Sequence, residues 1–184
     1  MKMIYIHGLN SSSKCENAII LKKRYGADCH APNLPNNPVL WGRYLNSYLS
    51  GLSNTDVVLI GSSTGGLFAN YFANKYGLNV VLINPVVDHK DFVGCIGINK
   101  NYHTSEEWIL TKEDVDSLEM YEVDKSNVPT YVLLGTNDEV LDYRKAESKL
   151  TNAKIIKKET DHRYRLEESD LKVIDMAREV TCVY

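Results

Sequence analysis

The sequence lacks the features that would place the protein across a membrane or on a nucleic acid. It has no stretch of about 18 consecutive apolar residues, so no segment predicts a membrane-spanning helix. Positive charge is not in surplus, because 21 Lys and Arg stand against 24 Asp and Glu and give a net charge of −3. No basic field is therefore available to bind nucleic acid. The apolar start Met1–His7 is too short for the core of a signal peptide and predicts a strand.

Cysteine is scarce and is not arranged as a metal site or a redox pair. The four cysteines, Cys15, Cys29, Cys95 and Cys182, are scattered along the chain without C-x-x-C spacing. Zinc sites require closely spaced ligand pairs, so we expect no metal on these residues. Unpaired thiols without an export signal are typical of the reducing cytoplasm, and we expect a cytoplasmic location.

What the sequence does contain is a regular alternation of apolar strand patterns with amphipathic helical patterns. Continuous Val/Ile/Leu segments joined by helices are typical of a parallel sheet that is covered on both faces. We therefore predict an α/β fold, a three-layer sandwich of about six mostly parallel strands with helices on both faces. The predicted strands are Met3–His7, Asp28–Ala31, Asp56–Ile60, Asn79–Asn84, Thr130–Leu134 and Ala153–Lys158. The predicted helices are Glu16–Tyr25, Leu40–Leu49, Gly66–Tyr76, Glu106–Tyr121, Tyr143–Leu150 and Ser169–Val180.

The length of the chain predicts one domain spanning residues 1–184. Residues 86–128 interrupt the alternation of strands and helices, and we refer to them as the cap segment. An insertion between two sheet strands is a usual place for a lid or a cap that shapes a binding site. Plain connecting structure is an equal alternative for this segment.

The most informative motif is Gly61-Ser62-Ser63-Thr64-Gly65, which follows a predicted buried strand and precedes a predicted helix. A sharp strand-to-helix turn of the G-x-S-x-G type lifts the central serine hydroxyl clear of the sheet. Gly61 and Gly65 are needed where a side chain would collide with the neighbouring strand or helix. We therefore predict Ser63 as a nucleophile, the alternative being an ordinary Gly/Ser turn. A phosphate-binding loop does not fit, because no Lys-Ser/Thr pair follows and the glycines are not spaced as G-x-G-x-x-G.

A serine nucleophile needs a base and an acid that orients the base. In parallel sheets such groups lie on loops at the carboxyl ends of the strands. Asp138 follows the predicted strand Thr130–Leu134 and is the candidate acid, with Asp88, Glu139 and Asp142 as competitors. Asp142 is better placed to cap the helix that begins after it.

His162 lies on the loop after the last predicted strand and is the candidate base. His30, His89 and His103 compete for this role, whereas His7, which stands next to a glycine, is better suited to shaping a loop. The resulting chain order of nucleophile, acid and base is the order found in α/β-hydrolases.

Two backbone N–H groups are candidates for an oxyanion hole. One belongs to Thr64, directly after the candidate nucleophile, and the other to Leu9 in the loop after the first strand. Gly8 would let this loop approach a substrate closely. A simple turn at the end of the strand is the alternative for residues 8–9.

Several sequence blocks, spread over nearly the whole chain, resemble those of compact α/β-hydrolases. They are most similar, in composition and order, to the YqiA-like branch of small bacterial esterases. Two positions depart from that pattern: Leu9 stands where an aromatic residue is frequent, and Glu159-Thr160-Asp161 replaces a glycine that commonly precedes the histidine. The blocks that carry the resemblance are Ile4–Ser12, Gly61–Gly66, Asn84-Pro85, Leu134–Tyr143 and Asp161-His162.

The resemblance implies a Ser–His–Asp triad of Ser63, His162 and Asp138 that hydrolyses acyl esters or acyl thioesters of small molecules. Such a mechanism needs no metal and no organic cofactor. Side chains of the cap segment are candidate walls of an acyl pocket, with ordinary packing as the commoner alternative; they are Phe92, Ile96, Tyr102 and Trp108.

Three other functions remain open at this stage. A catalytically silent hydrolase fold could serve as a binding protein. Acyl transfer and peptide cleavage use the same triad, although the short chain leaves little room for an extended peptide cleft. The sequence does not indicate the oligomeric state.

Overall fold

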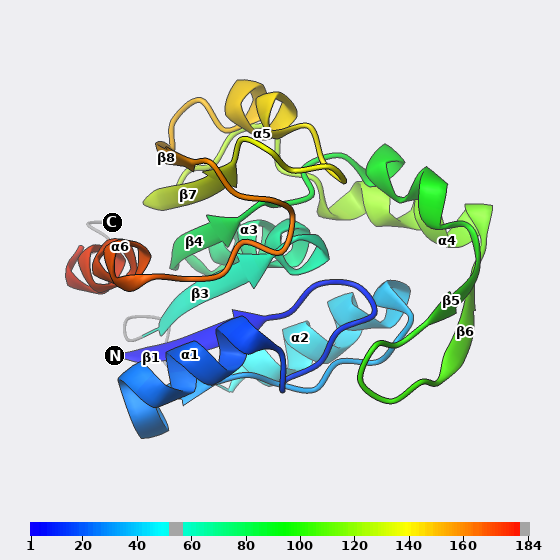
Figure 1. Ribbon diagram of the computed structural model, residues 1–184, viewed down its shortest axis with the longest axis horizontal. Coiled ribbons are helices and arrows are strands. Elements are labelled where there is room, and N and C mark those ends of the chain that lie inside the picture. Colours follow the sequence, from blue (N-terminus) through cyan, green and yellow to red (C-terminus); the bar gives the residue numbers. More distant parts are fainter. Residues whose placement is uncertain (52–56, 181–184) are drawn as a thin grey trace.

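The computed structural model describes residues 1–51 and 57–180, with a six-stranded parallel sheet at its centre (Figure 1). The strand order is β2-β1-β3-β4-β7-β8, and every neighbouring pair is parallel. Six strands were predicted and six form this sheet, although Asp56, the predicted start of the third, lies outside the described residues. The bounds are β1 (Lys2–Ile6), β2 (Cys29–His30), β3 (Val57–Ser62), β4 (Asn79–Ile83), β7 (Thr130–Gly135) and β8 (Lys154–Lys158).

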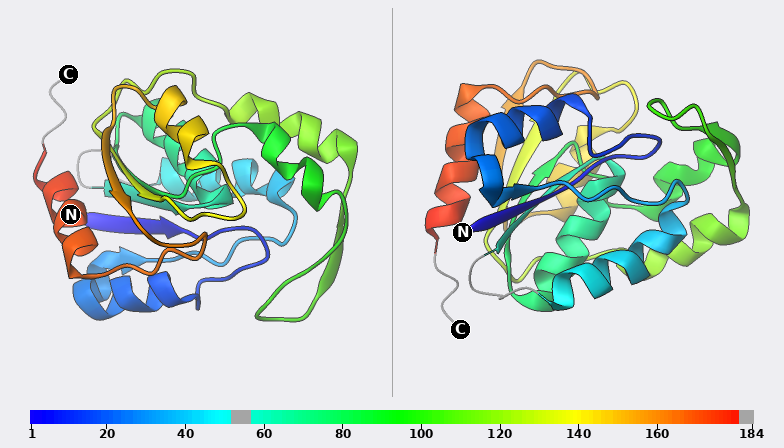
Figure 2. Two further views of the ribbon diagram at one scale, coloured as in Figure 1. Left: turned by 45° about the horizontal axis from the view of Figure 1, so that its top comes forward. Right: turned by 90° about the horizontal axis from the view of Figure 1, so that it is seen from below.

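Helices cover both faces of the sheet, which confirms the predicted α/β sandwich (Figure 2). Because side chains alternate along a strand, Met3 and Tyr5 pack with α1 and α6 on one face, whereas Ile4 and Ile6 pack with α2 and α3 on the other. The helices are α1 (Glu16–Tyr25), α2 (Trp41–Ser50), α3 (Thr64–Tyr76), α5 (Tyr143–Lys149) and α6 (Glu168–Glu179), with short 3-10 turns at η1 (Gly26–Asp28) and η2 (Pro38–Leu40).

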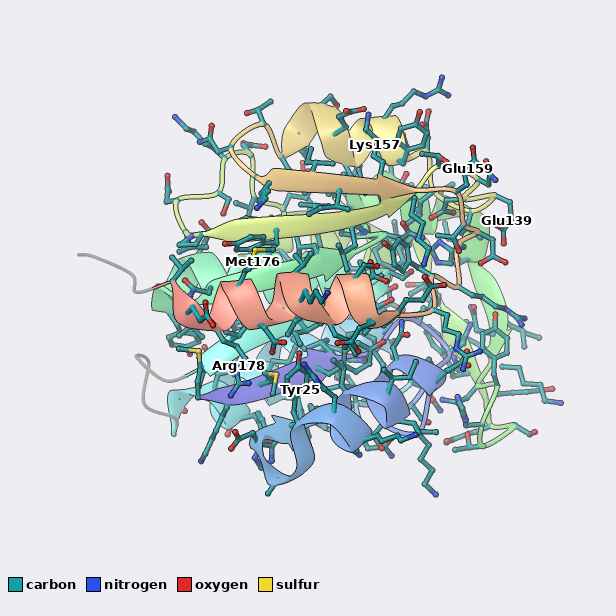
Figure 3. All side chains as sticks on the ribbon, turned by 60° about the vertical axis from the view of Figure 1, so that its left-hand side comes forward. Tyr25, Glu139, Lys157, Glu159, Met176 and Arg178 are labelled. Atoms are coloured by element: carbon teal, nitrogen blue, oxygen red, sulfur yellow. The ribbon has the colours of Figure 1, made fainter. Side chains whose placement is uncertain are left out.

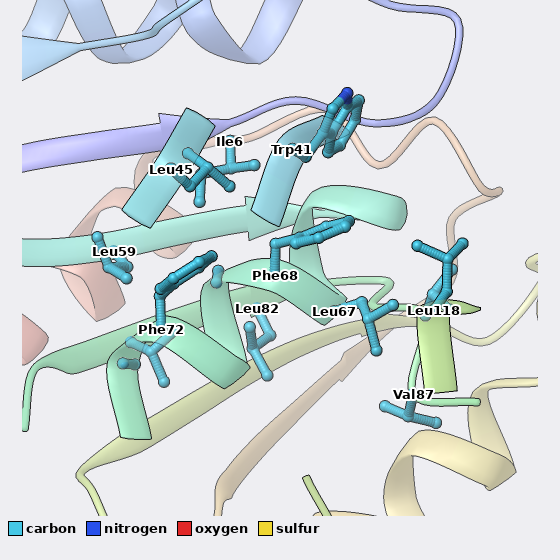
Figure 4. Close-up of a cluster of buried hydrophobic side chains, with 14 of the residues drawn as sticks. Ile6, Trp41, Leu45, Leu59, Leu67, Phe68, Phe72, Leu82, Val87 and Leu118 are labelled. Atoms are coloured by element: carbon cyan, nitrogen blue, oxygen red, sulfur yellow. The ribbon is translucent and has the colours of Figure 1, made fainter. Parts of the chain in front are cut away.

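The larger core lies between the sheet and α2 and α3 (Figure 4). Trp41 at the start of α2 is buried and its ring centroid lies 5.4 Å from that of Phe68 on α3. The indole Nε1–H of Trp41 donates to the carbonyl of Pro35, so the burial of this ring leaves no donor unpaired. This packing fixes α3, which begins at the candidate nucleophile, against the sheet.

The cap segment differs from the prediction, because the helix expected at Glu106–Tyr121 is wrong over its first residues. A strand β6 (Glu107–Leu110) instead pairs antiparallel with β5 (Gly97–Lys100). The helix starts only at Lys112 and is capped by Thr111, whose hydroxyl accepts from the Asp114 N–H while the Asp114 carboxylate accepts from the Thr111 N–H. The remaining elements of the segment are η4 (His89–Cys95), α4 (Lys112–Ser117) and η5 (Leu118–Tyr121).

The base of the cap segment is packed on the body of the protein. Leu118 is buried beside α3 (Figure 4), and the ring of Tyr121 lies 4.7 Å from that of Phe68. Gly42 on α2 makes room for this contact, since a Cβ there would lie 1.7 Å from the Tyr121 hydroxyl oxygen. From this base the β5–β6 hairpin extends outward at the edge of the molecule (Figure 1).

The carboxyl ends of the parallel strands share one edge of the sheet, as Figure 3 shows through the positions of Glu139 and Glu159 after β7 and β8. All the candidate catalytic residues follow strand ends at this edge. The longest described helix, α3, has 13 residues, and no described helix combines the length and apolarity needed to cross a bilayer.

Candidate active site

Ser63 occupies a sharp turn between β3 and α3. Its backbone has φ 53° and ψ −121°, a left-handed conformation that is costly for a residue with a side chain. Three backbone hydrogen bonds hold this conformation: the Ser63 N–H donates to Ile83 O at 2.9 Å, and the Ser63 carbonyl accepts from Gly66 at 2.8 Å and from Val86 at 3.0 Å. The turn is thus fixed by contacts to β4 and to the residues that follow it, as a reactive serine in a strained turn requires.

The glycines of the motif stand where backbone segments approach most closely. A Cβ on Gly61 would lie 2.3 Å from the Gly65 carbonyl oxygen, and one on Gly65 would lie 2.1 Å from the Ile6 carbonyl oxygen. Gly66 has the same requirement, because its Cβ would lie 2.5 Å from Pro85 Cβ. The collisions expected from the sequence for the first two glycines are confirmed, and the third was not anticipated.

His162 lies between Ser63 and Asp138. Its Nε2 is 3.0 Å from Ser63 Oγ, and its Nδ1 is 2.8 Å and 3.0 Å from the two carboxylate oxygens of Asp138. A carboxylate only accepts hydrogen bonds, so the partners assign the ring proton to Nδ1 and leave Nε2 free to accept the serine proton. The structure therefore brings the three predicted residues into one hydrogen-bonded chain.

The carboxylate of Asp138 is enclosed and rigidly held. Its side chain is 1% exposed, against 19% for His162. Besides the imidazole, Asp138 Oδ1 accepts from the backbone N–H groups of Val140 and Leu141, both at 2.8 Å. These donors fix the carboxylate in the orientation that faces the imidazole ring.

The competing acids have other partners. Asp88 accepts from the Lys90 N–H at the start of η4, and Asp142 accepts from the Arg144 N–H, which confirms that it caps α5. The Glu139 carboxylate accepts from the backbone N–H of His162 rather than from its ring. Hydrogen bonds from its own N–H and from that of His162 lower the pKa of Glu139.

The other histidines also lie in different settings. His30 and His103 are exposed, and His89 Nδ1 donates to Glu122 at 2.7 Å. His7 is buried, with Nδ1 2.9 Å from the Gly8 carbonyl and Nε2 3.4 Å from the Leu34 amide. Burial lowers the pKa of His7, although the hydrogen bond to the Gly8 carbonyl acts in the opposite direction. His7 thus shapes the loop after β1, as the sequence predicted.

Asn84 is a site residue to which sequence reasoning gave no role. Its buried amide donates from Nδ2 to the carbonyls of Asp161 at 3.1 Å and His162 at 3.3 Å, and its Oδ1 accepts from the Gly135 N–H at 2.6 Å. One side chain at the end of β4 therefore fixes the loops that carry the acid and the base. The sequence signal was the Asn-Pro pair directly after a buried strand.

The loop that precedes the candidate base carries side-chain hydrogen bonds at the point where a glycine is frequent in the family pattern. Asp161 takes over part of the turn, because its carboxylate accepts from the Arg163 N–H at 3.1 Å. Further along, Tyr164 has φ 23° and its hydroxyl donates to Asp170 at 3.0 Å. Side-chain bonds on both sides of His162 thus hold the ring toward Ser63.

One candidate oxyanion donor, Thr64, directly follows Ser63, and the other, Leu9, directly follows Gly8. Thr64 is the first residue of α3, and the first amides of a helix have no acceptor within the helix. Gly8 in the preceding loop lies against the nucleophile, since a Cβ there would be 3.2 Å from Ser63 Cβ and 3.7 Å from Ser63 Oγ. Within residues 1–51 and 57–180, no acceptor is paired with the Leu9 amide.

The predicted acyl-pocket walls have different surroundings. Phe92 is buried in the main core and Trp108 packs against that core, whereas Ile96 is 43% exposed and Tyr102 is 80% exposed. An 80% exposed ring encloses nothing, so Tyr102 is not a pocket wall, whereas Phe92, Ile96 and Trp108 stay candidates.

One grouping among the described residues has the spacing of metal ligands, and it is formed by Asp88, His89 and Glu122. The ammonium group of Lys149 pairs with the Glu122 carboxylate, whose side chain is 16% exposed. Burial acts to raise the pKa of Glu122, but the hydrogen bonds from Lys149 and His89 outweigh it and lower this pKa to about 2. The Lys149 ammonium group occupies the place at the Glu122 carboxylate that a metal ion would take. We therefore assign this grouping to an ion pair that joins the cap segment to α5.

The parallel sheet, its helical layers and the serine turn between β3 and α3 define the α/β hydrolase fold. Alpha/beta hydrolase domain-containing protein 10 from mouse superposes with a TM-score of 0.71 at 15% identity, over 94% of this chain and 86% of that chain. A pyrethroid hydrolase from Sphingobium faniae JZ-2 superposes with a TM-score of 0.63 at 12% identity, over 97% and 98% of the two chains. At these identities the likeness shows the fold.

Within this class the chain belongs to the family described as "Uncharacterised protein family (UPF0227)", whose sequence profile matches residues 2–176. The match spans nearly the whole chain and confirms the resemblance to the YqiA-like branch.

Proposed function

We propose that this protein is a serine hydrolase that cleaves carboxylic acyl esters or acyl thioesters of small substrates through an acyl-enzyme intermediate. The observation that carries the proposal is the hydrogen-bonded chain from Ser63 Oγ through His162 to Asp138, with links of 3.0 Å and 2.8 Å. The two solved structures compared above carry hydrolase in their titles, which supports a hydrolytic reaction.

In the proposed mechanism His162 Nε2 takes the hydroxyl proton as Ser63 Oγ attacks the acyl carbon. The negative charge that develops on the carbonyl oxygen is stabilised by the N–H groups of Thr64 and Leu9. Asp138 holds the ring in the required tautomer and stabilises the imidazolium.

The leaving alcohol or thiol takes the proton back from His162 when the tetrahedral intermediate collapses. A water molecule, deprotonated by the same ring, then attacks the acyl-Ser63 ester and releases the carboxylic acid. Each step moves one proton between His162 and an oxygen or sulfur atom, so the residues return to their starting state.

The remaining sequence-based expectations belong to the same proposal. One domain carries the site, the cap segment borders it and bounds the acyl pocket with Phe92, Ile96 and Trp108, and the protein acts in the cytoplasm. The substrate is a small molecule rather than a nucleic acid.

The proposal is tested by hydrolysis of p-nitrophenyl acetate and butyrate by the wild type and by Ser63→Ala. We expect the variant to lose about 10⁴-fold or more in turnover while its circular dichroism spectrum is unchanged. The neighbouring Ser62→Ala is the matched control, because Ser62 ends β3 and, among the described residues, His162 Nε2 is hydrogen-bonded to Ser63 Oγ and not to Ser62. Labelling by a serine-directed fluorophosphonate should follow the same pattern.

Equal activity in the wild type and in Ser63→Ala would contradict the proposal. So would absence of both hydrolysis and labelling in the wild type, a result that would favour a binding protein built on a hydrolase fold.

A further inference from the structure

The loop between β1 and α1, residues 7–15, carries the Leu9 amide and is tied to the tip of the β5–β6 hairpin (Figure 2). Three of the ties come from Asn10, which directly follows Leu9, and a fourth runs from Asn101 Nδ2 to the Ser11 carbonyl at 3.1 Å. The side chain of Asn10 donates from Nδ2 to Asn99 Oδ1 at 3.1 Å and accepts at Oδ1 from Trp108 Nε1 at 2.7 Å. Its carbonyl accepts from the Tyr102 N–H at 2.8 Å.

Asn99 and Trp108 are not independent partners, because they face each other across the β5–β6 ladder. The Asn99 amide is oriented by its own bonds, with Nδ2 donating to the carbonyls of Cys95 at 2.8 Å and Gly97 at 3.2 Å. Its Oδ1 is therefore the atom available to Asn10. Every polar atom in this contact has an assigned direction, so the hairpin accepts the Asn10 amide in one orientation.

Asn10 itself is in a conformation that needs support. It is 9% exposed and has φ 56°, in the left-handed region that asparagine tolerates better than most residues. Gly8, on the other side of Leu9, lies close to Ser63. It adds flexibility to the loop, because glycine restricts the backbone least. On its C-terminal side the Leu9 amide is restrained first by Asn10 and its partners, and beyond them by the bond from Asn101 to the Ser11 carbonyl.

The hairpin is a suitable support because the end of it that joins the body of the protein is held in the core. Leu110 at the end of β6 is fully buried, and Tyr121 packs on Phe68 of α3, the helix that begins at the nucleophile. The path from α3 through the hairpin to Asn10 therefore joins both sides of the candidate oxyanion hole.

We propose that Asn10 is a positioning residue, and that the cap segment holds the Leu9 amide in place for the oxyanion through the Asn99–Trp108 pair. This inference rests on the proposed function, since it assigns a duty within the same site. It makes the hairpin a fixed support of the catalytic loop, so that opening the hairpin would displace an oxyanion donor.

Two substitutions test the proposal in the full chain. Asn10→Gly keeps the left-handed backbone at no cost but removes both side-chain bonds, and Trp108→Phe removes the single donor while retaining an aromatic ring. Thr104→Val is the control, because it breaks a hydrogen bond within the hairpin loop, to the Glu106 N–H, that does not reach Asn10.

With p-nitrophenyl acetate we expect kcat to fall about 100-fold in Asn10→Gly and about 10-fold in Trp108→Phe. Neither loss should exceed the loss in kcat that follows complete removal of an oxyanion donor. In Asn10→Gly KM should stay within about twofold, because the oxyanion exists only in the transition state. A trifluoromethyl ketone, which forms the tetrahedral adduct, should lose affinity by the same factor as kcat/KM. The double variant should lose no more than Asn10→Gly, since the bond removed by Trp108→Phe is already absent in Asn10→Gly.

Unchanged kcat in both variants, or an equal loss in Thr104→Val, would overturn the proposal. Hydrogen exchange at the Leu9 amide separates this result from failure of the proposed function. If activity survives Ser63→Ala, faster exchange at Leu9 in Asn10→Gly and Trp108→Phe than in Thr104→Val still supports the positioning role. Equal exchange in all three variants overturns it.

Discussion

The side-chain amide of Asn84 donates to the backbone carbonyl of His162 over 3.3 Å, across 78 positions of sequence. The same amide accepts from Gly135 at the end of the neighbouring strand. One buried group thus sets the distance between the loops that carry the candidate acid and base.

Substitution of Asn84 by Asp should reduce turnover far more than a matched change at the other end of β4. Asn79 is also buried and donates to two carbonyls, those of Ala177 and Val180, away from the site. Each change replaces the donor by a carboxylate facing carbonyl oxygens and should cost about 1–3 kcal/mol of unfolding free energy.

Only Asn84→Asp should also lower kcat, by about 100-fold, because a small displacement of the base misaligns it with Ser63. Thermal unfolding and steady-state kinetics on both variants measure the two effects separately. Equal losses of activity in Asn84→Asp and Asn79→Asp, at equal folded fraction, would speak against a role of Asn84 in the site.

Asp138→Asn should lower kcat by about 10⁴-fold with little change in structure, as in other Ser–His–Asp enzymes, because an amide no longer enforces the tautomer of His162. Asp142→Asn is the paired control. Asn caps a helix as well as Asp does, so α5 and the activity should be retained. Comparable turnover in the two variants would exclude Asp138 as the acid.

Gly65→Ala should disrupt the serine turn. The added Cβ would lie 2.1 Å from the Ile6 carbonyl oxygen, and backbone on both sides would have to move. We expect a loss of about 3 kcal/mol in chemical unfolding. Gly94→Ala, where a Cβ meets no atom within 4 Å, should leave stability within about 0.5 kcal/mol of the wild type. A stable, active Gly65→Ala protein would be incompatible with this packing.

The ion pair of the cap segment should make stability depend on acid pH. The pKa of Glu122 is lowered from 4.5 to about 2, so its contribution is present above pH 4.5 and is lost as the pH falls toward 2. Glu122→Gln should therefore destabilise the protein at pH 6 and have a smaller effect at pH 3. Urea unfolding at the two pH values measures this difference.

Glu119→Gln, at an exposed position nearby, should show no such change between the two pH values. If Glu122→Gln destabilised the protein equally at pH 6 and at pH 3, the carboxylate would not owe its effect to the charges of Lys149 and His89.

The sequence by itself determined the parallel sheet and the place of the candidate nucleophile. Continuous apolar runs such as Val57–Ile60 have to be buried on both faces, and only a sheet covered by helices does this. The Ser63 motif was readable because its glycines and its strand-to-helix position are local features. Asp138 and His162 could be nominated because the loops after parallel strands converge at one edge.

Tertiary structure alone decided the details that hold the site together. The β5–β6 hairpin was missed because Glu107–Leu110 has no local pattern that excludes a helix, and its strand conformation depends on pairing with Gly97–Lys100. The contacts of Asn84 with His162 and of Asn10 with Trp108 join residues 78 and 98 positions apart. Hydrogen bonds between such distant groups arise only after the chain has folded, because no pattern within a short window of sequence specifies them.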